Sequence, residues 1–236
     1  MSVEIQVVGD PAAVCAQVLS EAAATGGHVV LTGGTSPQRA YTLAASQAPQ
    51  SWQGAKLWFS DERCVPPDDE RSNFGMVKRT LLDPLHAAGV EVGFCQRIKG
   101  EDGPQQAALE YQRELETLGT EVGAVSFELV LLGIGSDGHI CSMFPNQASV
   151  SDSTRLVAGV ERAGLAPFVP RVTLTFKALS AARRVLVLAT GAGKADAVAA
   201  AFAQDAPHTP EVPASLLVEH VGEIVVLVDE DAASRL

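Results

Sequence analysis

The chain has 236 residues, of which 47% are apolar, and carries a formal net charge of −11. This length suits one α/β domain with a sizeable core, and we expect a single domain over residues 1–236 because no Pro- or Ser-rich linker divides the chain. The acidic charge argues against a nucleic-acid partner. No apolar run approaches the roughly 20 residues of a membrane helix, and the N-terminus lacks the features of a signal peptide, so we expect a cytoplasmic protein without membrane contact.

Apolar, β-branched runs alternate with alanine-rich helical stretches throughout the chain. This alternation predicts a Rossmann-like α/β fold, with a mostly parallel sheet flanked by helices on both faces. The expected strands lie near residues 4–8, 28–32, 55–59, 90–94, 127–132, 156–160, 171–176, 184–189 and 223–228.

Helices are expected in most of the gaps between these strands. The first should begin with Asp10 as N-cap and Pro11 at the first helical position, and end near Gly26 and Gly27. A second clear helix begins near residue 104 and is expected to end at Gly119, because one apolar stripe runs along it through Ala107, Tyr111, Leu115 and Leu118.

Two polar segments, 146–155 and 203–215, are expected to form loops near strand ends. In open parallel sheets, those ends are where ligands usually bind.

Three glycines after the apolar run 127–132 form a G-x-G-x-x-G pattern: Gly133, Gly135 and Gly138. The pattern indicates dinucleotide binding when a long helix follows it. Here Pro145 and the polar segment 146–155 stand where that helix should continue. The sequence therefore argues against a dinucleotide site.

The same glycines allow the backbone to turn sharply beside a small ligand. Asp137 and His139 would then point into a pocket, where the carboxylate orients an imidazole suited to proton transfer near neutral pH. A lone histidine near an apolar run is more often structural, but the neighbouring Asp137 favours a catalytic interpretation of His139.

A second glycine pair, Gly33 and Gly34, follows the expected strand 28–32. Ser36 and Pro37 are predicted to be the N-cap and first residue of the next helix, whose positive end can hold an anion. An ordinary strand-to-helix turn is the alternative.

Charged residues Asp61, Glu62 and Arg63 follow the strand expected at 55–59, which suggests a site loop, with a solvated surface as the alternative. Arg63 can hold a phosphate in bidentate fashion. Asn73 could contact a sugar hydroxyl or cap the next helix.

Two further cations, Arg171 at the start of a strand and Lys194 at the start of a helix, could also reach the strand ends. Together with Arg63 they would supply the positive charge that an acidic protein needs around a phosphate. Each taken alone is more often a surface charge.

Neither a metal nor a disulfide is indicated by the sequence. The four cysteines are widely spaced, and His139 and the acidic residues show no recognisable ligand spacing. We therefore assign no metal site.

The ordered motifs GGTSP, SDER-x-VP, RSN, GIG-x-DGH, P-RVTLT and G-x-x-K resemble the 6-phosphogluconolactonase family, from Leu31 to Ser215. The resemblance implies a fold shared with glucosamine-6-phosphate deaminase/isomerase. It also implies hydrolysis of the sugar-phosphate lactone 6-phospho-D-glucono-1,5-lactone in the pentose phosphate pathway, by a monomeric enzyme that uses no cofactor.

With the resemblance, the expected site has two groups of residues. The catalytic residues are His139, as general base on water, and Asp137, which positions it. The substrate- or phosphate-binding residues are Gly33, Gly34, Thr35, Ser36, Asp61, Arg63, Asn73, Gly135, Arg171 and Lys194. Oxyanion donors are expected either around Gly33 and Gly34 or at Gly135, and the sequence does not choose between them.

Two alternatives remain open at this point. The deaminase/isomerase branch resembles this chain but carries a glutamate where Phe144 stands and a D-E-Y loop where Arg63 stands, and both departures favour a lactonase. A non-catalytic sugar-phosphate sensor would share the fold, although such regulators usually carry a DNA-binding module ahead of the sheet, whereas the first strand is expected here at residue 4.

Overall fold

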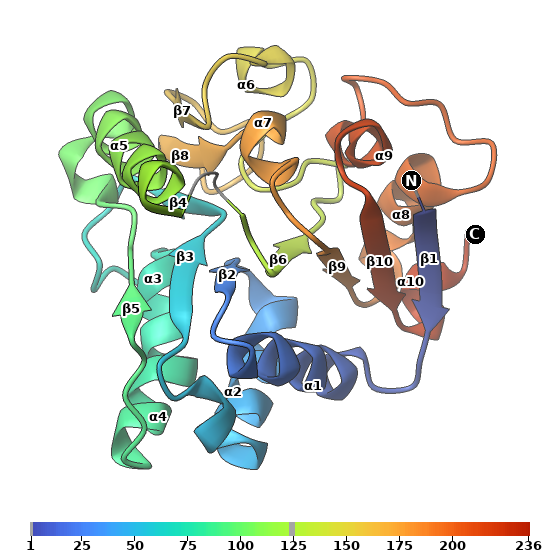
Figure 1. Cartoon of the computed structure of the whole chain (residues 1–236). Coiled ribbons are helices and arrows are strands. Elements are labelled where there is room, and N and C mark those ends of the chain that lie inside the picture. Colours follow the sequence, from blue (N-terminus) through green and yellow to red (C-terminus); the bar gives the residue numbers. More distant parts are fainter. Residues whose placement is uncertain (1, 123–125) are drawn as a thin grey trace.

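The computed structural model describes residues 2–122 and 126–236, with the side chains of 118–122 outside that description. Its centre is a sheet of seven strands in the order β1-β10-β9-β6-β2-β3-β5, and every neighbouring pair is parallel (Figure 1). The strands are β1 Ser2–Val7, β2 His28–Leu31, β3 Lys56–Phe59, β5 Phe94–Cys95, β6 Leu129–Gly133, β9 Val185–Ala189 and β10 Glu223–Val228. This confirms the predicted fold class.

Helices cover both faces of the sheet, as the near-continuous apolar runs of its central strands require. In Figure 1, α1 and α2 lie on one side, and α5 and α7 lie on the other. The α-helices are α1 Pro11–Ala24, α2 Thr35–Gln47, α3 Asn73–Val77, α4 Asp83–Ala87, α5 Pro104–Val122, α6 Ala148–Ser151, α7 Phe176–Leu179, α8 Ala195–Phe202, α9 Leu217–His220 and α10 Glu230–Ala233. Short 3-10 turns are η1 Pro49–Trp52, η3 Gly100–Asp102, η4 Ala192–Lys194 and η5 Pro213–Leu216, and η2 Lys78–Leu82 is a π-helix.

A second, antiparallel sheet lies beside α5, with the strand order β4-β8-β7 (Figure 1). Its strands are β4 Asp61–Arg63, β7 Val157–Val160 and β8 Arg171–Leu174. The segments 156–160 and 171–176 were expected as strands and are confirmed, but the partner strand β4 falls on residues expected to form a loop. Pairing with β8 overrides the low strand propensity of three charged residues.

Helix boundaries differ from expectation at two places. Asp10 caps α1 as predicted, since its carboxylate accepts a hydrogen bond from the N–H of Ala13 at 3.1 Å. The N-cap of α2 is Gly34 rather than Ser36, and α5 continues past Gly119. The burial predicted for Leu118 lies outside the described side chains.

Strand β5 also differs, because it covers only Phe94–Cys95 rather than 90–94. The polar segment 146–155 contains the short helix α6, and 203–215 runs as a loop into η5. Among the described residues, no helix combines the length and apolarity needed to cross a membrane.

The topology creates a crevice between β2 and β6, which are neighbours in the sheet. From β2 the chain crosses to β3 on one side, and from β6 it leads to β9 on the other. Loops that leave in opposite directions open a gap at the carboxyl ends of the strands, where ligands bind in such folds.

Candidate active site

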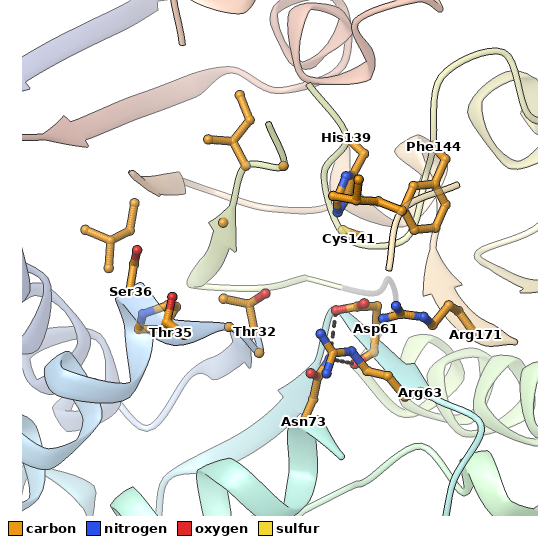
Figure 2. A pocket seen from close by; sticks show the side chains of 18 of the residues that line it. Thr32, Thr35, Ser36, Asp61, Arg63, Asn73, His139, Cys141, Phe144 and Arg171 are labelled. Atoms are coloured by element: carbon orange, nitrogen blue, oxygen red, sulfur yellow. Dashed lines mark hydrogen bonds between the residues drawn. The ribbon is translucent and has the colours of Figure 1, made fainter. Parts of the chain in front are cut away.

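A cavity of about 210 Å³ lies in this crevice. Pockets for drug-sized ligands run to roughly 300–1,000 Å³, so this one suits a small metabolite. Figure 2 shows how residues from distant parts of the chain face it. All the sequence-predicted site residues line it except Asp137: Gly33, Gly34, Thr35, Ser36, Asp61, Arg63, Asn73, Gly135, His139, Arg171 and Lys194.

Asp137 stands behind His139 rather than in the cavity wall. Its Oδ1 lies 2.5 Å from Nδ1 of His139 and also accepts the His139 backbone N–H at 3.3 Å. Burial opposes ionisation of this carboxyl group, but the hydrogen bond and charge of His139 outweigh it and lower the pKa of Asp137. An ionised carboxylate only accepts, so Nδ1 of the imidazole donates and, in the neutral ring, Nε2 is left with its lone pair.

Gly135 makes room for this pair. A Cβ atom at that position would lie 2.0 Å from Nδ1 of His139 and 2.5 Å from Oδ1 of Asp137. The N–H of Gly135 donates to the carbonyl of His139 at 2.8 Å and closes the turn. That N–H is therefore engaged inside the protein and is not a free oxyanion donor.

The other candidate donors belong to Gly33 and Gly34. No hydrogen bond within the described parts of the chain engages either N–H group. Gly34 has φ of 101°, a conformation that favours glycine. It begins α2, so the free N–H groups of the first helical turn also lie at this edge of the cavity.

Arg63 and Arg171 form a cross-strand pair. They are direct partners in the register of β4 and β8, and their side chains lie next to each other in Figure 2. Burial and the charge of Arg63 lower the pKa of Arg171, which is 4% exposed. Neither arginine has a carboxylate within ion-pair distance among the described residues.

Their hydrogen bonds go to backbone carbonyls instead. Arg63 donates to the carbonyl of Arg71 at 2.5 Å, and Arg171 donates to those of Pro167 at 2.8 Å and Val169 at 3.2 Å. Like charges directly opposite on a sheet destabilise it, so an anion bound between them would relieve the repulsion.

Lys194 lies in η4, after β9, and lines the same cavity. Burial lowers the pKa of Lys194, and the charge of Asp137 partly opposes this shift. The structure thus brings the predicted trio of cations to one cavity, where two of them are paired across β4 and β8.

Asn73 and Ser36 are both held by protein partners. The Nδ2 group of Asn73 donates to the backbone oxygen of Asp61 at 2.9 Å and to its Oδ1 at 3.1 Å. Ser72, rather than Asn73, caps α3 by accepting the N–H of Gly75. The hydroxyl of Ser36 lies 2.7 Å from that of Thr190, which joins the loops after β2 and β9.

Sequence patterns did not identify Glu62 as the residue that holds Arg63 and Asn73 in place. Glu62 is 2% exposed and accepts the N–H groups of Arg63, Asn73 and Phe74 at 2.7–2.8 Å. Burial raises the pKa of Glu62 despite these donors. The signal that could have found it is its position between Asp61 and Arg63, which line the cavity. Side chains alternate along a strand, so Glu62 points away from the cavity.

Phe144 also lines the cavity. Its ring lies 4.5 Å from that of His139, centroid to centroid, and the chain at Gly164 approaches so closely that a Cβ there would lie 2.9 Å from the Phe144 Cβ. An apolar side chain therefore occupies the space beside the imidazole. Within the described residues, no group of three or more His, Cys, Asp or Glu side chains is arranged to hold a metal ion.

The described part of the chain thus places three things around one small cavity: a histidine whose Nε2 has no hydrogen bond there, backbone N–H groups without one, and an arginine pair. Such a set can activate water, stabilise an oxyanion and hold a phosphate.

Known proteins resemble this chain in sequence and fold. The 6-phosphogluconolactonase of Mycobacterium tuberculosis is 36% identical over 212 residues, which cover 88% of this chain and 84% of that protein. The human 6-phosphogluconolactonase is 35% identical over 197 residues, 82% of this chain and 74% of that protein.

Solved structures also resemble this chain. The 6-phosphogluconolactonase of Trypanosoma brucei aligns over 100% of this chain and 99% of its own, with a TM-score of 0.84 and 25% identity. A monomeric glucosamine-6-phosphate deaminase aligns with a TM-score of 0.82 at 18% identity, which shows a shared fold alone. The family model described as glucosamine-6-phosphate isomerases/6-phosphogluconolactonase matches residues 5–226. The chain belongs to this family.

Proposed function

We propose that this protein hydrolyses 6-phospho-D-glucono-1,5-lactone to 6-phospho-D-gluconate in the oxidative pentose phosphate pathway. The observation that carries the proposal is that His139, hydrogen-bonded to Asp137 behind it, and the Arg63–Arg171 pair border one small cavity. The names of the relatives support the same substrate. Lactone hydrolysis involves no net oxidation or reduction, so the proposed reaction needs no redox cofactor. We further propose that the protein is a cytoplasmic monomer that acts without a cofactor.

His139 is the general base in this mechanism. Its Nε2 takes a proton from water as the water oxygen attacks C1 of the lactone, and Asp137 stabilises the imidazolium that forms. The ring oxygen leaves C1 and receives that proton from Nε2, which restores the neutral imidazole. One water is consumed, and the open-chain acid is the only product.

The carbonyl oxygen of the lactone gains negative charge during attack. We assign its stabilisation to the backbone N–H groups at Gly33 and Gly34, because the N–H of Gly135 is already bonded to His139. One well-aimed donor is worth roughly 3 kcal/mol.

The 6-phosphate lies between Arg63 and Arg171, which have no carboxylate partner among the described residues. Binding energy from this remote group fixes C1 relative to His139. Lys194 lines the same cavity and contacts the sugar-acid end or a second phosphate oxygen. Thr35, Ser36, Asp61 and Asn73 complete the walls.

Phe144 favours hydrolysis over the deaminase/isomerase reaction. The resemblance places a glutamate at this position in the deaminase, where it completes a triad for ring opening. A phenyl ring 4.5 Å from the imidazole can neither donate nor accept a proton.

The test uses freshly generated lactone and follows acid release above the spontaneous rate. His139→Ala should lower kcat/KM by on the order of a hundredfold, or about 2.7 kcal/mol. His86→Ala, an exposed histidine on α4, is the matched control and should keep the parent rate. A near-normal His139→Ala rate would remove the base assignment, and a parent protein that binds the lactone without turnover would indicate a sensor.

A further inference from the structure

The small antiparallel sheet carries two successive rows of side chains on one face. In the register of β4 and β8, Asp61 faces Thr173 and Arg63 faces Arg171. Positions two apart along a strand point to the same face, so the two rows are neighbours separated by about 6.8 Å. The second row is the arginine pair at the cavity.

Ser142 binds the first row with both its side chain and its backbone. Its hydroxyl donates to Oδ2 of Asp61 at 2.7 Å, and its backbone N–H donates to Oγ1 of Thr173 at 3.0 Å. Ser142 is completely buried. The segment that carries it is thus anchored on the same sheet face as the two arginines.

Ser142 is also only three residues from His139. Between them the chain makes a tight turn, closed by the N–H of Met143 donating to the carbonyl of Ile140 at 2.9 Å. Cys141 has φ of 52°, in the left-handed region that few residues other than glycine adopt. Because the turn is short, a shift of Ser142 also shifts His139.

Asp61 is held from its other side as well. Its Oδ1 accepts the hydroxyl of Ser60 at 3.1 Å and the Nδ2 group of Asn73 at 3.1 Å. Each carboxylate oxygen therefore has a neutral donor inside the protein, and the acceptor presented to Ser142 cannot easily turn away.

We propose that Ser142, through Asp61, is a positioning residue that sets the distance between His139 and the Arg63–Arg171 pair. The inference rests on the proposed function, in which one group acts on C1 and the other holds the phosphate. Removal of the Ser142–Asp61 hydrogen bond leaves His139 and the arginine pair intact, so the substrate still binds. Its C1 is then no longer held at the correct distance from Nε2 of His139. The loss should appear in kcat rather than in KM.

The first test compares Ser142→Ala with Ser149→Ala. Ser149 is a matched control, because it is buried in the nearby helix α6 and its hydroxyl has no hydrogen-bond partner among the described residues. Ser142→Ala should lower kcat about tenfold with KM within about twofold, since misplacement by 1 Å can cost about a hundredfold and a loosened tether less. Ser149→Ala should match the parent.

A second pair of variants separates positioning from charge and serves if Ser142→Ala does not fold. Asp61→Asn keeps an oxygen that can accept from Ser142, whereas Asp61→Ala keeps none. The asparagine variant should retain at least about fivefold more kcat than the alanine variant. Adding Ser142→Ala to Asp61→Ala should cost little more, because the shared bond is already gone.

Several outcomes would overturn the inference. These are an unchanged kcat in Ser142→Ala, a loss confined to KM, an Asp61→Asn variant as slow as Asp61→Ala, or additive losses in the double variant. A parent protein that does not accelerate lactone hydrolysis overturns the proposed function and this inference with it. A catalytic parent with an unaffected Ser142→Ala overturns this inference alone.

Discussion

Gly135→Ala tests whether the geometry of the His139–Asp137 pair is essential. The added Cβ would lie 2.0 Å from Nδ1 and 2.3 Å from Cε1 of His139, and 2.5 Å from Oδ1 of Asp137. A carbon atom in van der Waals contact lies about 3.5–4.0 Å from its neighbours, so the imidazole must move by more than about 1 Å to make room for the added Cβ. The 2.5 Å hydrogen bond between the two side chains cannot survive that shift.

The expected loss follows from that displacement. A misplacement of about 1 Å can cost about a hundredfold in rate, which corresponds to about 2.7 kcal/mol of transition-state stabilisation. Gly135→Ala should therefore approach the His139→Ala rate, while KM stays near the parent value because the arginine pair is untouched.

Steady-state kinetics with freshly made lactone measure this effect. Gly222→Ala is the matched control, since a Cβ there would meet nothing within 4 Å. Thermal unfolding should show that both variants remain folded at the assay temperature. A folded Gly135→Ala with a kcat within about threefold of the parent would refute the reasoning, because the pair would then tolerate a clash that should separate it.

Two further predictions concern the arginine pair and the pH dependence of stability. Arg63→Ala and Arg171→Ala should each raise KM about 10- to 100-fold, since a charged hydrogen bond contributes about 1.5–3 kcal/mol. Arg184→Ala is the control and should leave KM unchanged, because Arg184 precedes β9 and pairs with Glu223 at the start of β10. Unchanged KM and kcat in both cavity variants would place the phosphate elsewhere. Burial and the charge of Lys56 lower the pKa of His28, whose Nδ1 accepts the indole N–H of Trp58 at 2.7 Å. The unfolded chain therefore protonates His28 at a higher pH than the folded chain does, so the free energy of unfolding should fall as the pH drops below about 6.5. His28→Gln should reduce this pH dependence, measured by urea titrations at several pH values. An identical slope in His28→Gln would show that another group is responsible.

The sequence was informative where local chemistry decides the structure. Continuous β-branched runs predicted the central strands, since a parallel sheet buried on both faces demands them. Glycine-containing turns after those runs predicted which loops meet at the carboxyl edge, and the cavity brings together His139, Arg63 and Arg171 as expected.

Long-range pairing was the part that the sequence could not supply. Nothing local in Asp61, Glu62 and Arg63 favours a strand, and only the partner β8 makes one. The same pairing sets Arg63 beside Arg171. Ser142 gives no signal of its own, because its role depends on Asp61, which lies 81 positions away in the sequence.

A crystal structure with bound 6-phosphogluconate tests the central claim most directly. The account predicts that the phosphate lies between the guanidinium groups of Arg63 and Arg171, with the C1 carboxylate against Nε2 of His139. A product bound in the opposite orientation, or outside this cavity, would contradict it.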